Sequence, residues 1–379
     1  MRATTVELPT VSTTRNDTLD ALKGIGVLFV VLGHNWIVSE KGELFRIIFS
    51  FHMPLFFFVA GVLLRTDLSF GLFLYSRAQS LLKPFFATLL IVAAATTVAR
   101  LAGAQGVGDT SWLRLLFWLY GTGPVMPWNL TPLWFLPHLF LALMLSFLLL
   151  RNSDSDDYRY SWALTLLMLW LGAATVDFAW RGLEVGGFAV APNLGLPWSL
   201  DLLLVSTPFV IAGYLLRQRV AKFQITGSGF ALAVLLFGAM HCAFDETIDL
   251  NLRSYGSTLV ASAQAFAGVY ICLCLARLAQ RRKWVARTLA YLGSASLFIF
   301  MFHYYVHNVA MWRLPRHLES MQTCAAIAFV LSVVVPVAMF EVTRRVGVLR
   351  TFFLPDQWKE VTSKLAEPAG GAPESSHPG

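Results

Sequence analysis

The sequence predicts an all-α membrane protein, a polytopic bundle of about ten transmembrane helices with both termini in the cytoplasm. Three observations predict it: composition, apolar runs of spanning length, and the placement of Lys and Arg. Of the 379 residues, 56% are hydrophobic and only 13% are charged, and the mean hydropathy is +0.62. A soluble domain carries about 25% charged residues, so this composition indicates a lipid solvent.

Ten apolar stretches predict the spans, because each is close to the ~20 residues that cross a hydrocarbon core. They cover residues 20–38, 46–64, 81–101, 133–150, 162–180, 199–216, 228–244, 257–276, 290–311 and 323–341. A shorter apolar piece at 112–120 is expected to be interfacial or re-entrant. Residues 1–19 form a cytoplasmic N-terminal segment, 20–345 the transmembrane domain, and 346–379 a cytoplasmic tail, disordered from about 366 by its composition.

The basic residues predict the orientation. With the N-terminus in the cytoplasm, the cytoplasmic segments hold 21 of the 29 Lys and Arg residues and the outer loops hold 8. This bias follows the positive-inside rule. The net charge of +7 is spread over short loops and forms no patch, so membrane lipid is an expected partner and nucleic acid is not.

The first span carries two residues that do not suit lipid, Lys23 and His34. Eleven residues make about three helical turns, so both lie on one face, separated by about 16 Å. Asp20 is placed to pair with Lys23. Such a polar stripe faces the protein interior or a wet cavity. Two alternatives stay open: Lys23 could snorkel to the interface, and His34 could be a structural histidine bonded to a neighbouring helix.

Further histidines lie in the second and ninth spans. His52 stands near the outer end of the second span, and the short loop before it allows His34 and His52 to approach each other. Gly61, further along this span, permits close packing of helices. His303 and His307 share a helix face, but no third ligand is evident nearby, so no metal site is expected.

The pattern of Lys23, ten residues and His34, followed by FHMPLFFFVAG at 51–61, resembles the start of the acyltransferase-3 family. In particular it resembles the branch of fucose 4-O-acetylase-like proteins and related polysaccharide O-acetyltransferases. Weaker likenesses extend the match over residues 15–345: they are Arg77 to Lys83-Pro84, the tryptophan motif Leu133-Trp134-Phe135-Leu136, and the late segment 294–303 that ends in His303.

Three positions depart from the family pattern. Lys23 stands where Arg is common, Ala60 stands where Ser often precedes the glycine, and His138 replaces an acidic residue after the tryptophan motif. These departures leave the acceptor more open than the reaction.

The resemblance implies transfer of an acyl group, usually acetyl, from cytoplasmic acyl-coenzyme A to a sugar hydroxyl. Acetyl-CoA would be a co-substrate, the acceptor would be a carbohydrate or glycolipid of a surface polysaccharide, and the location would be a bacterial cytoplasmic (inner) membrane.

The residues fit such a reaction. Neutral histidine can take the proton of an attacking hydroxyl, which makes His34 the expected catalytic base. Cations hold phosphates, so coenzyme A is expected at Lys23, Arg77 and Lys83. The expected acceptor or oxyanion contacts are Asn35, His52, Trp134 and His303. Trp128 and Trp134 could stack on a sugar ring or belong to an interfacial aromatic belt.

Three other functions remain as alternatives. A transporter or flippase predicts an inverted repeat and broken helices at matched positions, and the sequence shows neither. A different class of membrane acyltransferase would use His and Asn from distant spans, as at His34-Asn35 and His307-Asn308. A non-catalytic partner in polysaccharide assembly predicts that substitution of His34 affects stability at most.

Overall fold

The computed structural model describes residues 17–38, 42–103, 112–127, 129–152, 158–176, 183–185, 188–190 and 193–355. These residues are mostly helical, as the composition predicts. Two short antiparallel hairpins interrupt the helices: β1 (Leu183–Val185) pairs with β2 (Phe188–Val190), and β3 (Ile248–Asp249) pairs with β4 (Ser254–Tyr255).

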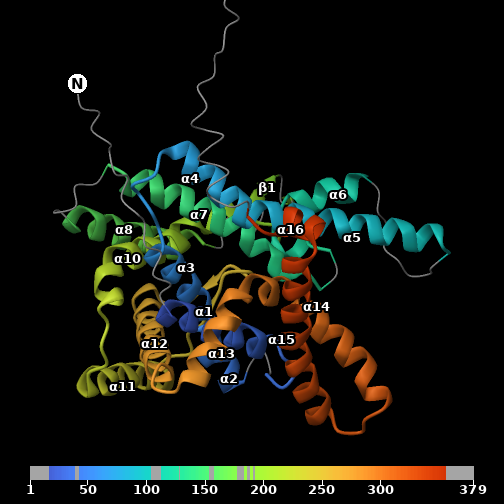
Figure 1. The fold of residues 1–379 in the computed structure, drawn as a ribbon. Coiled ribbons are helices and arrows are strands. Elements are labelled where there is room, and N and C mark those ends of the chain that lie inside the picture. The colour runs from blue at the N-terminus through green and yellow to red at the C-terminus, as the bar shows by residue number, and fades with distance from the viewer. Residues whose placement is uncertain are drawn as a thin grey trace, which may run out of the picture.

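The helices follow one another along the whole chain. They are α1 (Asp17–Gly33), α2 (Glu43–Phe49), α3 (His52–Val62), α4 (Phe70–Arg77), α5 (Lys83–Leu101), α6 (Trp112–Leu119), α7 (Phe135–Leu150), α8 (Tyr158–Thr175), α10 (Leu203–Ala221), α11 (Gly227–Ala243), α12 (Thr258–Ala279), α13 (Lys283–Ser294), α14 (Ser296–Arg313), α15 (Met321–Arg345) and α16 (Gly347–Phe353). Figure 1 shows α4 to α8 together on one side of the molecule, with α1, α2 and α11 to α15 on the other. Helix α10 joins the two sides by packing against both α3 and α8.

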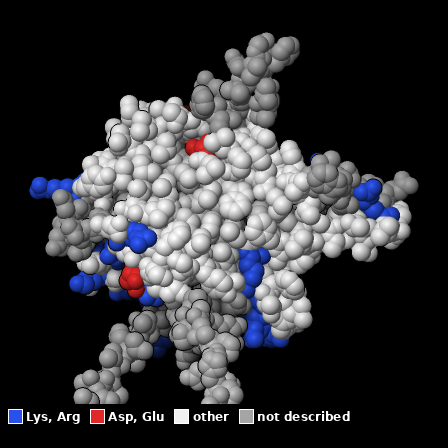
Figure 2. Space-filling model, turned by 90° about the horizontal axis from the view of Figure 1, so that it is seen from above, with Lys and Arg blue, Asp and Glu red and all other residues white. Residues whose placement is uncertain are grey.

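All ten apolar stretches predicted from the sequence contain helix in the described residues. Six of these helices are long and apolar enough to cross a membrane, or seven if α13 and α14 count as one span. Helix α11 is apolar but shorter. Figure 2 shows a broad face with few charged side chains, and Lys and Arg lie mostly toward its edges. The protein is therefore a multi-pass membrane protein, whereas ten spans and cytoplasmic termini stay predictions.

Several predicted boundaries were wrong. The first span was expected to continue to residue 38, but α1 ends at Gly33, so His34 and Asn35 lie in the turn that follows it. The third span was expected to begin at 81. Instead α4 runs through a π-helical turn at Ala78–Leu82 directly into α5, giving one helical segment of 32 residues.

Two helical spans are interrupted, which the sequence analysis did not foresee. Ser50 and Phe51 separate α2 from α3, so His52 is the first residue of α3. Ala295 separates α13 from α14, and the two helices meet at an angle of 76°. Irregular backbone at membrane depth is tolerated only where protein or a wet cavity surrounds it. The break between α2 and α3 accordingly lies beside the buried polar residues Ser50 and His52.

Glycines allow a close crossing of α3 and α10. A Cβ atom at Gly61 of α3 would collide with the backbone carbonyl of Val210, and one at Gly213 of α10 would collide with that of Phe58. Small residues allow helices to approach to this degree in membranes, so the expected role of Gly61 in close packing is confirmed. This crossing holds α3, and with it His52, against α10.

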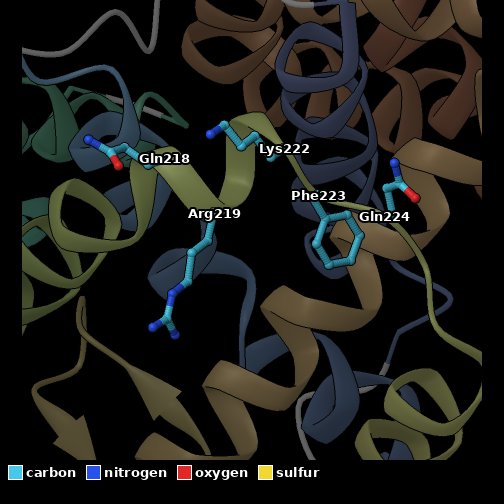
Figure 3. A pocket seen from close by; sticks show the side chains of 5 residues that line it. All are labelled: Gln218, Arg219, Lys222, Phe223 and Gln224. Carbon is cyan, nitrogen blue, oxygen red and sulfur yellow. The ribbon is translucent and has the colours of Figure 1, made fainter.

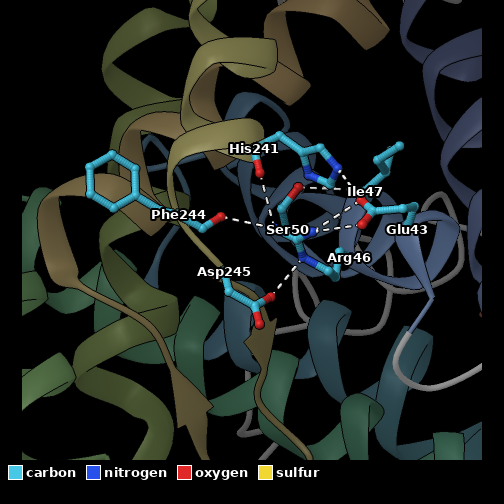
Figure 4. Close-up of polar contacts among 7 residues, drawn as sticks. All are labelled: Glu43, Arg46, Ile47, Ser50, His241, Phe244 and Asp245. Carbon is cyan, nitrogen blue, oxygen red and sulfur yellow. Dashed lines mark hydrogen bonds and ion pairs between the residues drawn. The ribbon is translucent and has the colours of Figure 1, made fainter.

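Arg46 ties α2 to the end of α11 (Figure 4). Its Nε atom lies 2.7 Å from a carboxylate oxygen of Asp245, and its Nη2 donates to the carbonyls of His241 and Phe244. Glu43 accepts from Arg46 and lies 2.7 Å from Nε2 of His241. The network fixes α2, which directly precedes the helix that carries His52.

The beginning of the predicted tail is folded. Helix α16 packs against α5 and α15, and the ring of Phe353 lies 5.7 Å from that of Phe298. Residues 1–16 and 356–379 lie outside the described residues, so the predicted segment and disordered tail stay predictions.

Candidate functional site

His34 lies at the end of α1 among aromatic rings. Its backbone N–H still donates to the carbonyl of Val30, so helical geometry reaches this residue. The face shared with Lys23 is thereby preserved. The His34 ring is 5.4 Å from the ring of His303, 5.3 Å from that of Tyr304 and 5.9 Å from that of Phe49.

His303 is fully buried on α14, and its hydrogen bonds define its protonated nitrogen. Nδ1 lies 2.9 Å from the carbonyl oxygen of Phe300 and 3.0 Å from that of Ile299, and a carbonyl accepts only from N–H. Neutral His303 therefore carries its proton on Nδ1. Its Nε2 is a bare acceptor, buried and without a hydrogen-bond partner.

His52 has the same arrangement on α3. Its Nδ1 donates to the carbonyl of Ile48 over 2.9 Å, which leaves Nε2 as an acceptor. The ring of Phe49 lies 4.6 Å from His52 and 5.9 Å from His34, so it contacts both histidines. The predicted approach of His34 and His52 is present, with Phe49 packed against both rings.

Asn35 and His307 hold the turn after α1 in place. The Asn35 amide donates to the carbonyl of Ala325 on α15, and its oxygen accepts from the N–H of Ile37. The N–H of Trp36 donates to Nε2 of His307 over 3.2 Å. Asn35 is thus bonded to the protein itself, in a geometry that anchors His34 beside α14.

The predicted donor-binding cations lie in two parts of the bundle. Lys23 pairs with Asp20 over 2.6 Å, as its spacing predicted. Arg77 and Lys83 flank the π-helical turn, which packs against α7, whereas α1 packs against α12 and α13. The Arg77 guanidinium lies 5.1 Å above the ring of Phe73, and its buried Nε has no hydrogen-bond partner.

A polar pocket of about 450 Å³ opens at the end of α10, in a segment predicted to be cytoplasmic. Figure 3 shows its five lining residues, Gln218, Arg219, Lys222, Phe223 and Gln224. None of the predicted site residues lines it. Phe223 packs against the hydrophobic cluster that includes Leu19 and Leu22 of α1.

Trp134 connects to the histidines through aromatic rings. It contacts Phe135, whose ring lies 4.9 Å from that of Phe300, and Phe300 lies 6.2 Å from His303. Trp128 lies outside the described residues. Within the described part of the chain, no group of three or more His, Cys, Asp or Glu side chains is arranged to hold a metal ion.

We call His34, His52, His303 and His307 the histidine centre. It combines the half-buried imidazole of His34 with the buried imidazoles of α3 and α14, which can accept hydrogen bonds. The sequence model of the family described as an acyltransferase domain matches residues 16–341 of this chain. The chain belongs to the acyltransferase-3 family. No curated protein and no solved structure matches it.

Family membership makes this protein a membrane acyltransferase. Two further residues lie near His34 that the sequence did not identify as candidate site residues. The ring of Tyr304 packs against that of His34. His307, which shares a helix face with His303, accepts a hydrogen bond from the N–H of Trp36.

Proposed function

We propose that this acyltransferase transfers an acetyl group from acetyl-CoA to a sugar hydroxyl of a surface polysaccharide or glycolipid. The proposal places it in a bacterial inner membrane. One observation carries it: the ring of His34, at the end of the first helix, lies 5.4 Å from that of buried His303, whose Nε2 atom has no hydrogen-bond partner. A general base for a hydroxyl needs a neutral imidazole held in a fixed orientation.

His34 takes the proton of the acceptor hydroxyl as the hydroxyl oxygen attacks the carbonyl carbon of the thioester. The new C–O bond forms, the C–S bond breaks, and the proton passes from His34 to the departing thiolate. His303 accepts a hydrogen bond from the second nitrogen of His34 while His34 is protonated. A hydrogen bond to a charged group contributes about 1.5–3 kcal/mol, so His303 positions and stabilises the base.

The donor enters from the cytoplasmic side in this proposal. Lys23 lies about 16 Å from His34 along α1, a separation that suits an extended pantetheine arm. Arg77 and Lys83 supply further positive charge for the phosphates. His52 and Trp134, with the turn at Asn35, contribute to the acceptor side.

The test measures release of free coenzyme A from acetyl-CoA by the purified protein, with a membrane glycan extract as acceptor. We expect His34→Ala to abolish turnover and Lys23→Ala to raise the half-saturating donor concentration. His317→Ala is the matched control, because this histidine is exposed and lies outside the histidine centre.

Three results would count against the proposal. Full activity of His34→Ala would exclude His34 as the catalytic base but would leave the proposed acetyl transfer in place. Equal loss with His317→Ala would indicate general damage to the protein. Absence of donor turnover in the parent with every extract would favour a transporter or an assembly partner.

A further inference from the structure

A second group of buried polar side chains lies between α7, α10 and the predicted outer loops. His138 of α7 and Ser206 of α10 are both fully buried, and Nε2 of His138 lies 2.9 Å from the hydroxyl oxygen of Ser206. The ring of Trp134 lies 5.6 Å from His138. This pair therefore adjoins the aromatic residues that lead to the histidine centre.

Three polar atoms of this region have no hydrogen-bond partner: Oγ1 of Thr122, Nδ1 of His138 and Oδ1 of Asn251. Thr122 and His138 are fully buried. The segments that carry the three atoms are in contact. A Cβ atom at Gly121 would meet Pro137 and Trp198, and one at Gly123 would meet Oδ1 of Asn251.

The backbone around these atoms is strained. Trp198 and Ser199 have φ values of 54° and 55°, in the left-handed region that side chains other than glycine disfavour. The backbone of both residues lies beside the His138 ring. Strain of this kind persists only where the surrounding structure enforces it, and it clusters at functional sites.

A buried ion pair enforces the strained turn. Arg253, fully buried and itself at φ 54°, lies 2.9 Å from a carboxylate oxygen of Asp201. It also donates to the hydroxyl of Ser199 and to the carbonyl of Asn251. The ion pair thus holds together the segments near 121–123, 198–201 and 251–253. Hydrogen-bonding capacity remains unused at Thr122, His138 and Asn251.

Unpaired buried polar atoms are costly, and folded proteins retain few of them without a purpose. A hydroxyl, an imidazole nitrogen and an amide oxygen together offer both donor and acceptor capacity. Sugar hydroxyls also donate and accept, and a pyranose presents several of them on one ring. Trp134 adds an aromatic surface next to His138.

We infer that the cluster of Thr122, His138, Ser206 and Asn251 binds the acceptor, and that its ligand is the hydroxyl-bearing face of a sugar ring. The inference rests on the proposed function. It assigns the acceptor to a site built from the predicted outer loops, joined to His303 by Trp134, Phe135 and Phe300. In this inference the hydroxyls of the sugar take up the hydrogen-bonding capacity of these side chains.

The experiment compares Thr122→Val with Thr122→Ser. Valine has nearly the shape of threonine but lacks the hydroxyl, whereas serine keeps it. Release of coenzyme A is measured at fixed acetyl-CoA while the concentration of a membrane glycan extract is varied. We expect Thr122→Val to raise the half-saturating extract concentration roughly two- to tenfold, the equivalent of one hydrogen bond, and Thr122→Ser to stay near the parent.

Ser332→Ala is the matched control, because Ser332 is also fully buried with an unpaired hydroxyl. It lies on α15, which packs against α1, α14 and α16, and its loss should leave the half-saturating concentration unchanged. Thermal unfolding of each variant identifies folding defects. Removal of an unpaired buried hydroxyl should leave the midpoint unchanged or raise it.

The outcomes separate this inference from the function on which it rests. The parent could show extract-dependent turnover while Thr122→Val has the same half-saturating extract concentration as the parent. In that case the acceptor does not bind at this cluster, and the proposed acetyltransferase function stands. If Thr122→Val and Ser332→Ala change saturation equally, the effect is not specific to this cluster. If no extract stimulates the parent, the proposed function fails and this inference fails with it.

Discussion

At the scale of single residues, His303 shows how a buried imidazole can be committed to one tautomer. Two carbonyls of its own helix accept from Nδ1, so Nε2 is left as an acceptor beside His34. The same bonding pattern at His52 means that helix carbonyls, and no carboxylate, orient both rings. A neutral centre of this kind suits a membrane interior, where an added charge is expensive.

Substitution of His303 tests this role. His303→Phe keeps the volume but removes Nε2, and we expect turnover to fall about ten- to a hundredfold because a charged hydrogen bond is lost. His303→Gln places an amide near the same point and should restore part of the rate. The measurement is coenzyme A release at saturating donor, with the pH–rate profile of each variant. Equal rates for the Phe and Gln variants would indicate a role in packing only.

The buried ion pair of Arg253 and Asp201 gives a stability prediction. Arg253→Met leaves the carboxylate of Asp201 buried without its cation, which costs about 3–5 kcal/mol in comparable pairs. We expect a marked fall in the thermal unfolding midpoint in detergent, with partial recovery in Arg253→Met/Asp201→Asn. Arg65→Met is the control, since Arg65 and Asp67 form an exposed pair that contributes little. Equal shifts in both single variants would contradict the prediction.

Sequence reasoning predicted some residue contacts and missed others for a clear physical reason. The pairing of Lys23 with Asp20 and the placement of Lys23 and His34 on one face follow from helical periodicity alone. The bond between His138 and Ser206 joins residues 68 positions apart, and no local pattern indicates it. His303 was proposed from a family likeness, and only packing of α14 against α1 places it beside His34.

At the scale of helices, hydropathy indicated where helices form but not where they end or break. Burial of apolar side chains in lipid produced helices at all ten predicted stretches. The end of α1 at Gly33 and the break at Ser50–Phe51 depend on bonds to distant residues, namely Ala325, His307 and Asp245. The bend at Ala295 follows directly after Gly293 and Ser294, a pair of a kind that accompanies helix kinks, but these residues do not indicate the size of the angle.

The crossing of α3 and α10 provides a prediction at this scale. Gly61→Ala puts a methyl group against the backbone carbonyl of Val210, and backbone cannot move aside as a side chain can. We expect destabilisation of about 1–3 kcal/mol, typical of overpacking, seen as a lower unfolding midpoint. Gly238→Ala on α11 is the control, because nothing lies within 4 Å of its added Cβ. A similar loss in both variants would exclude a specific crossing effect.

At the scale of the whole molecule, the placement of Lys and Arg predicts the topology. Alkaline phosphatase fused after Arg253 should be active, because the loop is predicted to lie outside. Fused after Arg282 it should be inactive, whereas a fluorescent protein at that position or at the C-terminus should fluoresce. These reporters fold on opposite sides of a bacterial inner membrane. The reverse pattern of reporter activity would show that the bundle has the opposite orientation, with the Lys23 end of α1 outside.

The bend at Ala295 acts as a lever between the two faces of the membrane. Helix α13 packs along α1, where Gly24 faces Leu289 and Gly293 faces Asp20. His303 lies eight residues beyond the bend, a lever arm of about 12 Å. A tilt of about 10° in α14 therefore displaces His303 by about 2 Å, enough to open or close its contact with His34. A small movement at the predicted cytoplasmic end of the bundle would therefore change the distance between the rings of His34 and His303.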